Sequence, residues 1–128
     1  MDEERLPGPS GDQKSSFAAR SAPGLQPGQV VVSVTGDIDL NSETRLREAL
    51  TQLESGPPRR VIVDLSGVEF MASAGIHVLL DVGAALRSEG GLLIIACARP
   101  VVARVLTLTG ADQLVPVAGT VADALAWP

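Results

Sequence analysis

The sequence predicts a single α/β domain, with about four strands in one mostly parallel sheet and helices as the connections. Three apolar runs, residues 30–36, 60–65 and 92–98, lack the polar alternation of a strand with one face in water. Segments with helical periodicity separate these runs. Strands without a solvated face belong to parallel sheets whose strands are joined by crossover helices. The pattern leaves the strand order open.

The N-terminal part divides into a tail and the start of the domain. Residues 1–14 are acidic and rich in Pro and Gly, so we expect a disordered tail there and a folded domain over 15–128. Residues 16–23 alternate weakly and are a candidate for an antiparallel edge strand. A turn rich in Gly and Pro follows at 24–29, and the β-branched run at 30–36 predicts a strand.

The segment after this strand predicts a helix. Asn41 or Ser42 is suited to cap it, and Glu43 and Arg47 form an i,i+4 pair. Its apolar residues recur at the spacing of one helix face. They are Leu46, Ala49, Leu50 and Leu53.

The second half of the chain repeats the alternation. Strand 60–65 precedes a helix that starts near Ser73, and strand 92–98 precedes a helix with Pro100 at its start and Gly110 at its end. A short last strand lies in 114–119, and Thr120 caps a final helix in 121–127. One face of the helix after Ser73 is apolar and consists of Ile76, Leu79, Leu80, Gly83 and Leu86.

Composition excludes several functions. The net charge is −5 with only 10 Lys and Arg, and aromatic residues make up 2% of the chain, which argues against nucleic-acid binding. No apolar run is long enough for a membrane span, and no apolar signal segment begins the chain. A single cysteine, Cys97, fits a reducing compartment. We therefore expect a cytoplasmic protein without membrane insertion.

Ser73 lies where a strand gives way to a helix, and three roles are open to it. It can cap the helix, since serine is a favoured N-cap residue. With Gly75 two positions later, it half-matches the turn that presents a nucleophilic serine. It can also accept a phosphate, because a helix start tolerates negative charge and a phosphate there can block a partner without unfolding the domain.

The residues argue against catalysis. Met71 replaces the first glycine of the nucleophile turn, and His77, the only histidine, lies on the same helix as Ser73. His77 and Asp81 are more simply a solvated i,i+4 pair. One His and one Cys do not make a zinc site, and Cys97 is expected to fill core space in a strand. We predict no enzymatic activity, no cofactor and no metal.

Three segments resemble one family. They are VVVSVTGDIDLNSETRLREAL, VIVDLSGVEFMASAGIHVLL and GGLLIIACARPVVARVLTLTGADQLVPV, and the likeness extends from about residue 30 to 127. Together they resemble the STAS domain and, within it, the bacterial anti-sigma factor antagonists. The resemblance implies a sheet of about five strands with helices packed mainly on one face. It also implies that the partner is an anti-sigma factor with serine kinase activity.

The resemblance assigns roles to residues. Ser73 matches the phosphorylated serine or threonine, and Asp39 and Asp37 match acidic positions beside it. Ala72 stands where the family often has Asp, and the loss of that carboxylate affects how a kinase orients the hydroxyl. Ala74 replaces a second hydroxyl, which leaves Ser73 as the sole phosphoacceptor in the loop. The predicted partner-binding residues are Asp37, Asp39, Met71, Ala72, Ser73, Ala74, Gly75 and His77.

The resemblance therefore predicts an anti-sigma factor antagonist that acts in transcription regulation and stress response. Unphosphorylated, it binds the anti-sigma factor and frees a sigma factor; phosphorylation of Ser73 ends the binding, and a phosphoprotein phosphatase is a further candidate partner. The alternative is a STAS subunit that is never phosphorylated and acts as a scaffold in a larger signalling or lipid-transport complex. Ala72 favours this alternative, whereas Ser73 and the acidic GDID segment argue against it.

Overall fold

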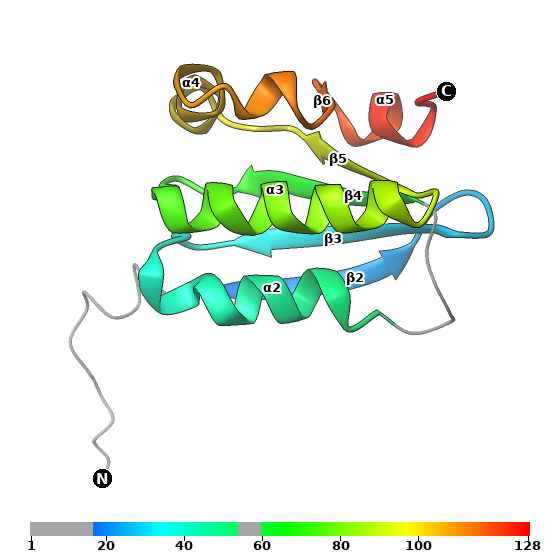
Figure 1. Ribbon diagram of the computed structural model, residues 1–128, viewed down its shortest axis with the longest axis horizontal. Coiled ribbons are helices and arrows are strands. Elements are labelled where there is room, and N and C mark those ends of the chain that lie inside the picture. Colours follow the sequence, from blue (N-terminus) through cyan, green and yellow to red (C-terminus); the bar gives the residue numbers. More distant parts are fainter. Residues whose placement is uncertain (1–16, 54–59) are drawn as a thin grey trace, which may run out of the picture.

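The computed structural model describes residues 17–53 and 60–128, and the tail predicted for 1–14 lies outside them. Its strands form one five-stranded sheet in the order β2-β3-β4-β5-β6 (Figure 1). The strands are β2 (Ala18–Pro23), β3 (Gln29–Thr35), β4 (Arg60–Gly67), β5 (Leu92–Ala96) and β6 (Val117–Ala118). The helices are α2 (Glu43–Thr51), α3 (Ser73–Ser88), α4 (Pro100–Leu108) and α5 (Val121–Leu125), with short 3-10 helices η1 (Leu40–Ser42) and η2 (Ala111–Gln113).

The sheet is mostly parallel, as predicted. β3, β4, β5 and β6 pair in parallel, and β2 joins β3 antiparallel at the edge. The predicted edge strand is therefore confirmed. Because the parallel strands all end at the same edge, the loops that leave β3, β4 and β5 meet there, at the left of Figure 1.

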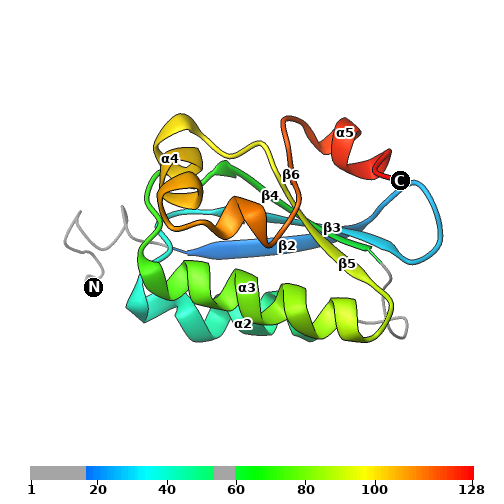
Figure 2. The same ribbon diagram turned by 45° about the horizontal axis from the view of Figure 1, so that its top comes forward.

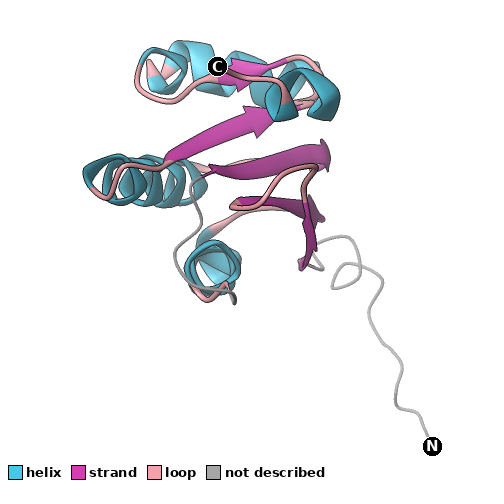
Figure 3. Cartoon of the chain, turned by 90° about the vertical axis from the view of Figure 1, so that its right-hand side faces the viewer, coloured by secondary structure: helices cyan, strands magenta, loops and turns pink. Residues whose placement is uncertain are grey.

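Alternate residues of the strands enter two apolar layers. On β4, Val61, Val63 and Leu65 join the large core beneath α2, α3 and α4, whereas Ile62 joins a small cluster with Ala124 of α5. α2 and α3 therefore lie side by side on one face (Figure 3), and α5 lies on the other (Figure 2). The expectation that helices pack mainly on one face is confirmed.

Two local expectations were wrong. Neither Asn41 nor Ser42 caps α2 with its side chain, because the 3-10 helix η1 precedes α2 and Asp39 caps that turn instead. Cys97 does not belong to a strand, because β5 ends one residue earlier and Cys97 has a φ of 60°, outside the extended region. The other predicted ends agree: Pro100 begins α4, and Thr120 caps α5 through a bond from the Asp123 amide.

Beyond the ends of β3 and β4, the two loops stay paired around Ile38. Its amide donates to the Phe70 carbonyl at 2.9 Å, and its carbonyl accepts from the Ala72 amide at 2.8 Å. Ile38 forms an isolated parallel bridge with Met71 and is fully buried. The start of α3 is thereby fixed against the loop that leads to α2.

Gly75 is required for this close approach. A Cβ at that position would lie 2.4 Å from Cγ2 of Ile38 and 3.1 Å from Cγ of Met71, and the first gap is too short for a real contact. At Gly83, also in α3, the nearest atom would be Cγ2 of Val115 at 3.2 Å. A methyl group at Gly75 would therefore disturb the packing more than one at Gly83.

We predict that Gly75→Ala lowers the free energy of unfolding by about 1–3 kcal/mol, because the buried Ile38 cannot move aside freely. Gly83→Ala is the matched control: its smaller strain is offset by a gain in helix propensity of about 1 kcal/mol. Urea unfolding of both variants measures the difference. Equal stability of the two variants would contradict the close contact.

Candidate functional site

Ser73 is the first residue of α3 and its side chain is exposed. The position before it, Ala72, has the extended backbone of an N-cap residue, with φ −87° and ψ 171°. The capping role considered for Ser73 is therefore wrong, because the serine lies one position inside the helix. Within the described residues, no hydrogen bond joins the Ser73 hydroxyl to the protein. The described part of the fold therefore leaves the exposed Ser73 hydroxyl available for a chemical role.

Ala72 leaves the start of α3 without a side-chain cap. The Gly75 amide bonds the Ala72 carbonyl at 2.9 Å, but alanine has no side-chain oxygen to accept from the first-turn amides. An acidic residue at this position would be suited to that role. The departure at Ala72 thus has a structural consequence as well as the chemical one expected from the sequence.

The two acidic residues of the GDID segment differ in what they do. The Asp39 carboxylate accepts from the amides of Asn41 and Ser42 at 3.0 and 3.2 Å, and the Ser42 hydroxyl accepts from the Asp39 amide at 2.9 Å. This reciprocal capping box gives Asp39 a structural role that the sequence analysis missed. Asp37 is half-buried, and its carbonyl accepts from the Ser42 hydroxyl at 3.1 Å.

Two large apolar side chains lie exposed on the loops next to Ser73. Leu40 in η1 is 75% exposed, and Phe70, just before the Ile38–Met71 bridge, is 51% exposed. Sequence reasoning did not select them, although an apolar residue at each loop position was a signal. A few buried side chains, often aromatic, carry most of the binding energy of a protein interface, and its core is apolar. Exposed apolar residues around a free hydroxyl suit a surface for a protein partner.

Arg99 ties the third loop of this edge to the second. Its Nε donates to the Ser66 carbonyl at 2.7 Å, and its guanidinium lies 3.8 Å from the Glu69 carboxylate. Both side chains of the ion pair are largely exposed, so its contribution to stability is small. The contact holds the loop after β5 beside the loop that carries Phe70.

The predicted partner-binding residues separate into surface and support. Ser73 and His77 are exposed, and four others are half-buried, so these six can contribute surface. The half-buried four are Asp37, Asp39, Ala72 and Ala74. Met71 and Gly75 are buried: the Met71 side chain packs beneath the loop, Gly75 lets the backbone approach Ile38, and both offer a partner little area. Burial at these two positions follows from the Ile38 contact, and the partner-binding role of the set stays a prediction.

His77 and Asp81 do not form the expected pair. The Asp81 carboxylate instead lies 3.2 Å from Arg47 on α2, and Arg47 also lies 3.9 Å from Glu43. The predicted pair of Glu43 and Arg47 is therefore confirmed, with Asp81 as an additional partner. Packing of α2 against α3 brings these charges together, which sequence spacing does not reveal.

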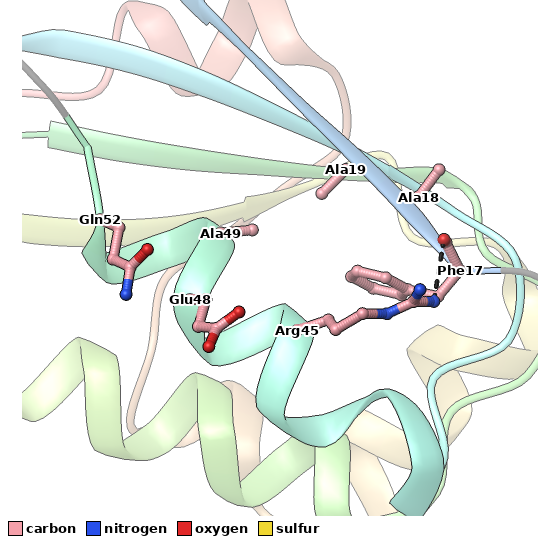
Figure 4. Close-up of a pocket in the computed structure, with 7 residues that line it drawn as sticks. All are labelled: Phe17, Ala18, Ala19, Arg45, Glu48, Ala49 and Gln52. Carbon is pink, nitrogen blue, oxygen red and sulfur yellow. Dashed lines mark hydrogen bonds between the residues drawn. The ribbon is translucent and has the colours of Figure 1, made fainter.

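A separate hollow of about 430 Å³ lies between β2 and α2 (Figure 4). Arg45 stacks over the Phe17 ring, 5.1 Å from its centroid, and donates to the Phe17 carbonyl at 3.0 Å. The charge of Arg45 is thus engaged in holding the start of β2, and no residue around Ser73 contributes to this hollow. Its lining comprises Phe17, Ala18, Ala19, Arg45, Glu48, Ala49 and Gln52.

The part of the chain that the structure describes contains no cluster of three or more His, Cys, Asp or Glu side chains suited to a metal. In the same residues, no helix has the length and apolarity of a membrane span. The edge around Ser73 combines an exposed hydroxyl, apolar side chains, a few carboxylates, Arg99 and His77, and this geometry suits recognition by a protein.

Comparisons with known proteins agree with this geometry. A model of the STAS domain family matches residues 19–124. The anti-sigma-F factor antagonist RsfB of Mycobacterium tuberculosis is 31% identical over 98 residues, which cover 77% of this chain and 80% of that protein. The crystal structure of an anti-sigma factor antagonist from Mycobacterium paratuberculosis matches with a TM-score of 0.77 and 32% identity, over 88% of this chain and 93% of that one.

The fold alone is shared more widely. The STAS domain of a SulP transporter from Vibrio cholerae matches with a TM-score of 0.64 and 22% identity, over 80% of this chain and 81% of that one. The chain thus belongs to the STAS domain family, in the group of the anti-sigma factor antagonists. The family and fold class predicted from the sequence are confirmed.

We predict that Ala72→Asp raises the free energy of unfolding by about 1 kcal/mol, because a carboxylate at this N-cap position accepts from first-turn amides of α3 and favours the positive helix end. Ala72→Asn is the matched control, since it supplies the cap without the charge. Urea unfolding compares both with the wild type. If neither variant is more stable than the wild type, the first-turn amides of α3 already have hydrogen-bond partners, which contradicts the prediction.

Proposed function

We propose that this protein is an anti-sigma factor antagonist whose binding surface surrounds Ser73, and that phosphorylation of Ser73 ends the binding. The observation that carries the proposal is the Ser73 hydroxyl, which is exposed and makes no hydrogen bond to the described residues. A kinase can reach such a group, and the fold does not depend on it. The names of its relatives, which are anti-sigma factor antagonists, supply the class of partner.

In the unphosphorylated state, Leu40 and Phe70 serve as apolar anchors for the partner. They lie on loops that the Ile38–Met71 bridge holds beside the start of α3. Burial of a large apolar side chain contributes about 1.5–3 kcal/mol. Ala72 and Ala74 are small enough to let a partner approach the hydroxyl closely.

Phosphorylation would act locally. A phosphate adds about −1.5 to −2 charges at neutral pH to an edge that already carries Asp37 and Glu69. A partner whose surface fits a small hydroxyl then meets a bulky group and additional negative charge, which costs several kcal/mol. Since each 1.4 kcal/mol changes affinity about tenfold, release would be close to complete.

The remaining steps of the proposal come from the family resemblance. The anti-sigma factor itself carries the serine kinase activity, and a phosphatase restores the free serine. The protein then acts in the cytoplasm as a regulator without catalytic activity of its own. Because Ala72 replaces an acidic residue, this protein offers the kinase fewer contacts with which to orient the Ser73 hydroxyl.

A second candidate function is a STAS scaffold that is never phosphorylated. The alanine at position 72 favours it, and the same fold occurs in the STAS domain of a transporter. Incubation with the cognate anti-sigma factor and ATP, followed by mass spectrometry, separates the two. Phosphate on Ser73 supports the switch, and a partner complex without any phosphate incorporation supports the scaffold.

We expect Ser73→Ala to retain binding to the cognate anti-sigma factor and to resist inactivation by ATP. Ser73→Asp should weaken binding at least about tenfold, because a carboxylate supplies part of the phosphate charge. Calorimetric titration measures both, with thermal unfolding alongside. Equal affinity of the two variants would contradict the switch, and an unfolded Ser73→Asp protein would contradict its local mechanism.

We expect Phe70→Ala to weaken the same complex by about tenfold or more, because it removes an apolar anchor beside Ser73. Leu25→Ala is the matched control: Leu25 is 80% exposed but lies in the turn between β2 and β3, at the opposite end of the strands (Figure 1). Titration of both variants tests the placement of the interface. Equal effects of the two substitutions would place the partner elsewhere.

A further inference from the structure

His77 lies one helical turn after Ser73 on α3, and both side chains are exposed. On a helix, residues four positions apart are neighbours, with Cβ atoms about 5–6 Å from each other. A phosphate on Ser73 therefore comes within reach of the imidazole. His77 is also the only histidine of the chain.

The other charges beside His77 are already paired. On α2, the helix that packs against α3, Arg47 lies 3.2 Å from Asp81 and 3.9 Å from Glu43. Asp81 follows His77 by four positions on α3, and its charge is thus neutralised by Arg47. Among these groups, His77 is the one whose charge can change near neutral pH.

On the described loops beside Ser73, the cation Arg99 already has partners. Arg99 is engaged with Glu69 at 3.8 Å and with the Ser66 carbonyl at 2.7 Å. The loop before η1 contributes the carboxylates of Asp37 and Asp39, which carry the same sign as a phosphate. Within the described residues, His77 is therefore the side chain placed to pair with a new negative charge at Ser73.

We propose that His77 is the internal partner of a phosphate on Ser73 and takes up a proton when that phosphate is present. The inference rests on the proposed phosphorylation and adds a regulatory element to the same site. The phosphate dianion favours the imidazolium, so His77 stays protonated to higher pH. By reciprocity, the imidazolium favours the dianion, so the second ionisation of the phosphate moves to lower pH.

The pair makes the phosphorylated state respond to pH. Below the pKa of histidine in an unfolded chain, about 6.5, the imidazolium offsets part of the phosphate charge and stabilises the phosphorylated fold. As pH rises through the raised midpoint of His77, this stabilisation is lost and the site becomes more negative. The phosphorylated site therefore carries more negative charge on the alkaline side.

The test uses full-length protein with phosphoserine inserted at position 73 during translation, so it needs no kinase. The ring protons of the single histidine are followed by NMR across a pH series. We expect the His77 midpoint to lie about half a pH unit higher than in unphosphorylated protein. In ³¹P spectra, the phosphate midpoint should be lower in the wild-type phosphoprotein than in the phosphorylated His77→Gln variant.

The double variant His77→Gln, Ala84→His is the matched control. Ala84 is exposed on the same helix, 11 residues from Ser73, which places a histidine there roughly 16 Å away along the axis. At about 0.1 M salt, that distance exceeds the screening length. The midpoint of the new histidine should therefore not respond to the phosphate.

Two results would overturn the inference: equal His77 midpoints with and without phosphate, or an equal shift in the double variant. Neither result bears on the proposed function, because the anti-sigma factor titration measures partner release directly. Conversely, a shifted His77 midpoint with unchanged partner affinity would support the phosphate pair and contradict the switch. The two proposals thus fail separately.

Discussion

The arrangement of this site depends on one contact, the burial of Ile38 beneath Gly75. β3 and β4 end before their chains separate, yet Ile38 continues their pairing through bonds to Phe70 and Ala72. Only a residue without Cβ lets α3 begin so close to that bridge. Because the contact joins two loops at the edge of the sheet, it fixes where Leu40, Phe70 and Ser73 lie relative to one another.

A surface built in this way suits a modification switch. The scaffold takes its stability from the layers on either side of the sheet, and the Ser73 hydroxyl makes no hydrogen bond to the described residues. In the proposed function, a phosphate there would change charge and shape at the surface and leave the buried bridge of Ile38 and Met71 in place. The proposal thus assigns recognition and stability to different side chains, so that a partner could be gained or lost without unfolding.

The helix starts show how far local reasoning extends. Thr120 was correctly predicted as a cap, since its bond to the Asp123 amide involves only neighbours in sequence. At α2, Ser42 occupies the predicted N-cap position, but its side chain makes no capping bond, because its hydroxyl is engaged in the capping box of the preceding 3-10 turn with Asp39. At α3, the capping role considered for Ser73 was wrong, because the Ile38 bridge fixes the backbone of Ala72 as the last extended residue.

The sequence by itself determined the fold class, the edge strand, the order of elements and the position of Ser73 at a strand-to-helix joint. These follow from periodicity and from local residue preferences, which the chain carries without knowledge of its contacts. Only the tertiary structure decided that Met71 is buried and Phe70 exposed, and that Arg47 takes Asp81 away from His77. Neighbours in sequence cannot specify these contacts, because they arise where separate loops and helices meet across the sheet.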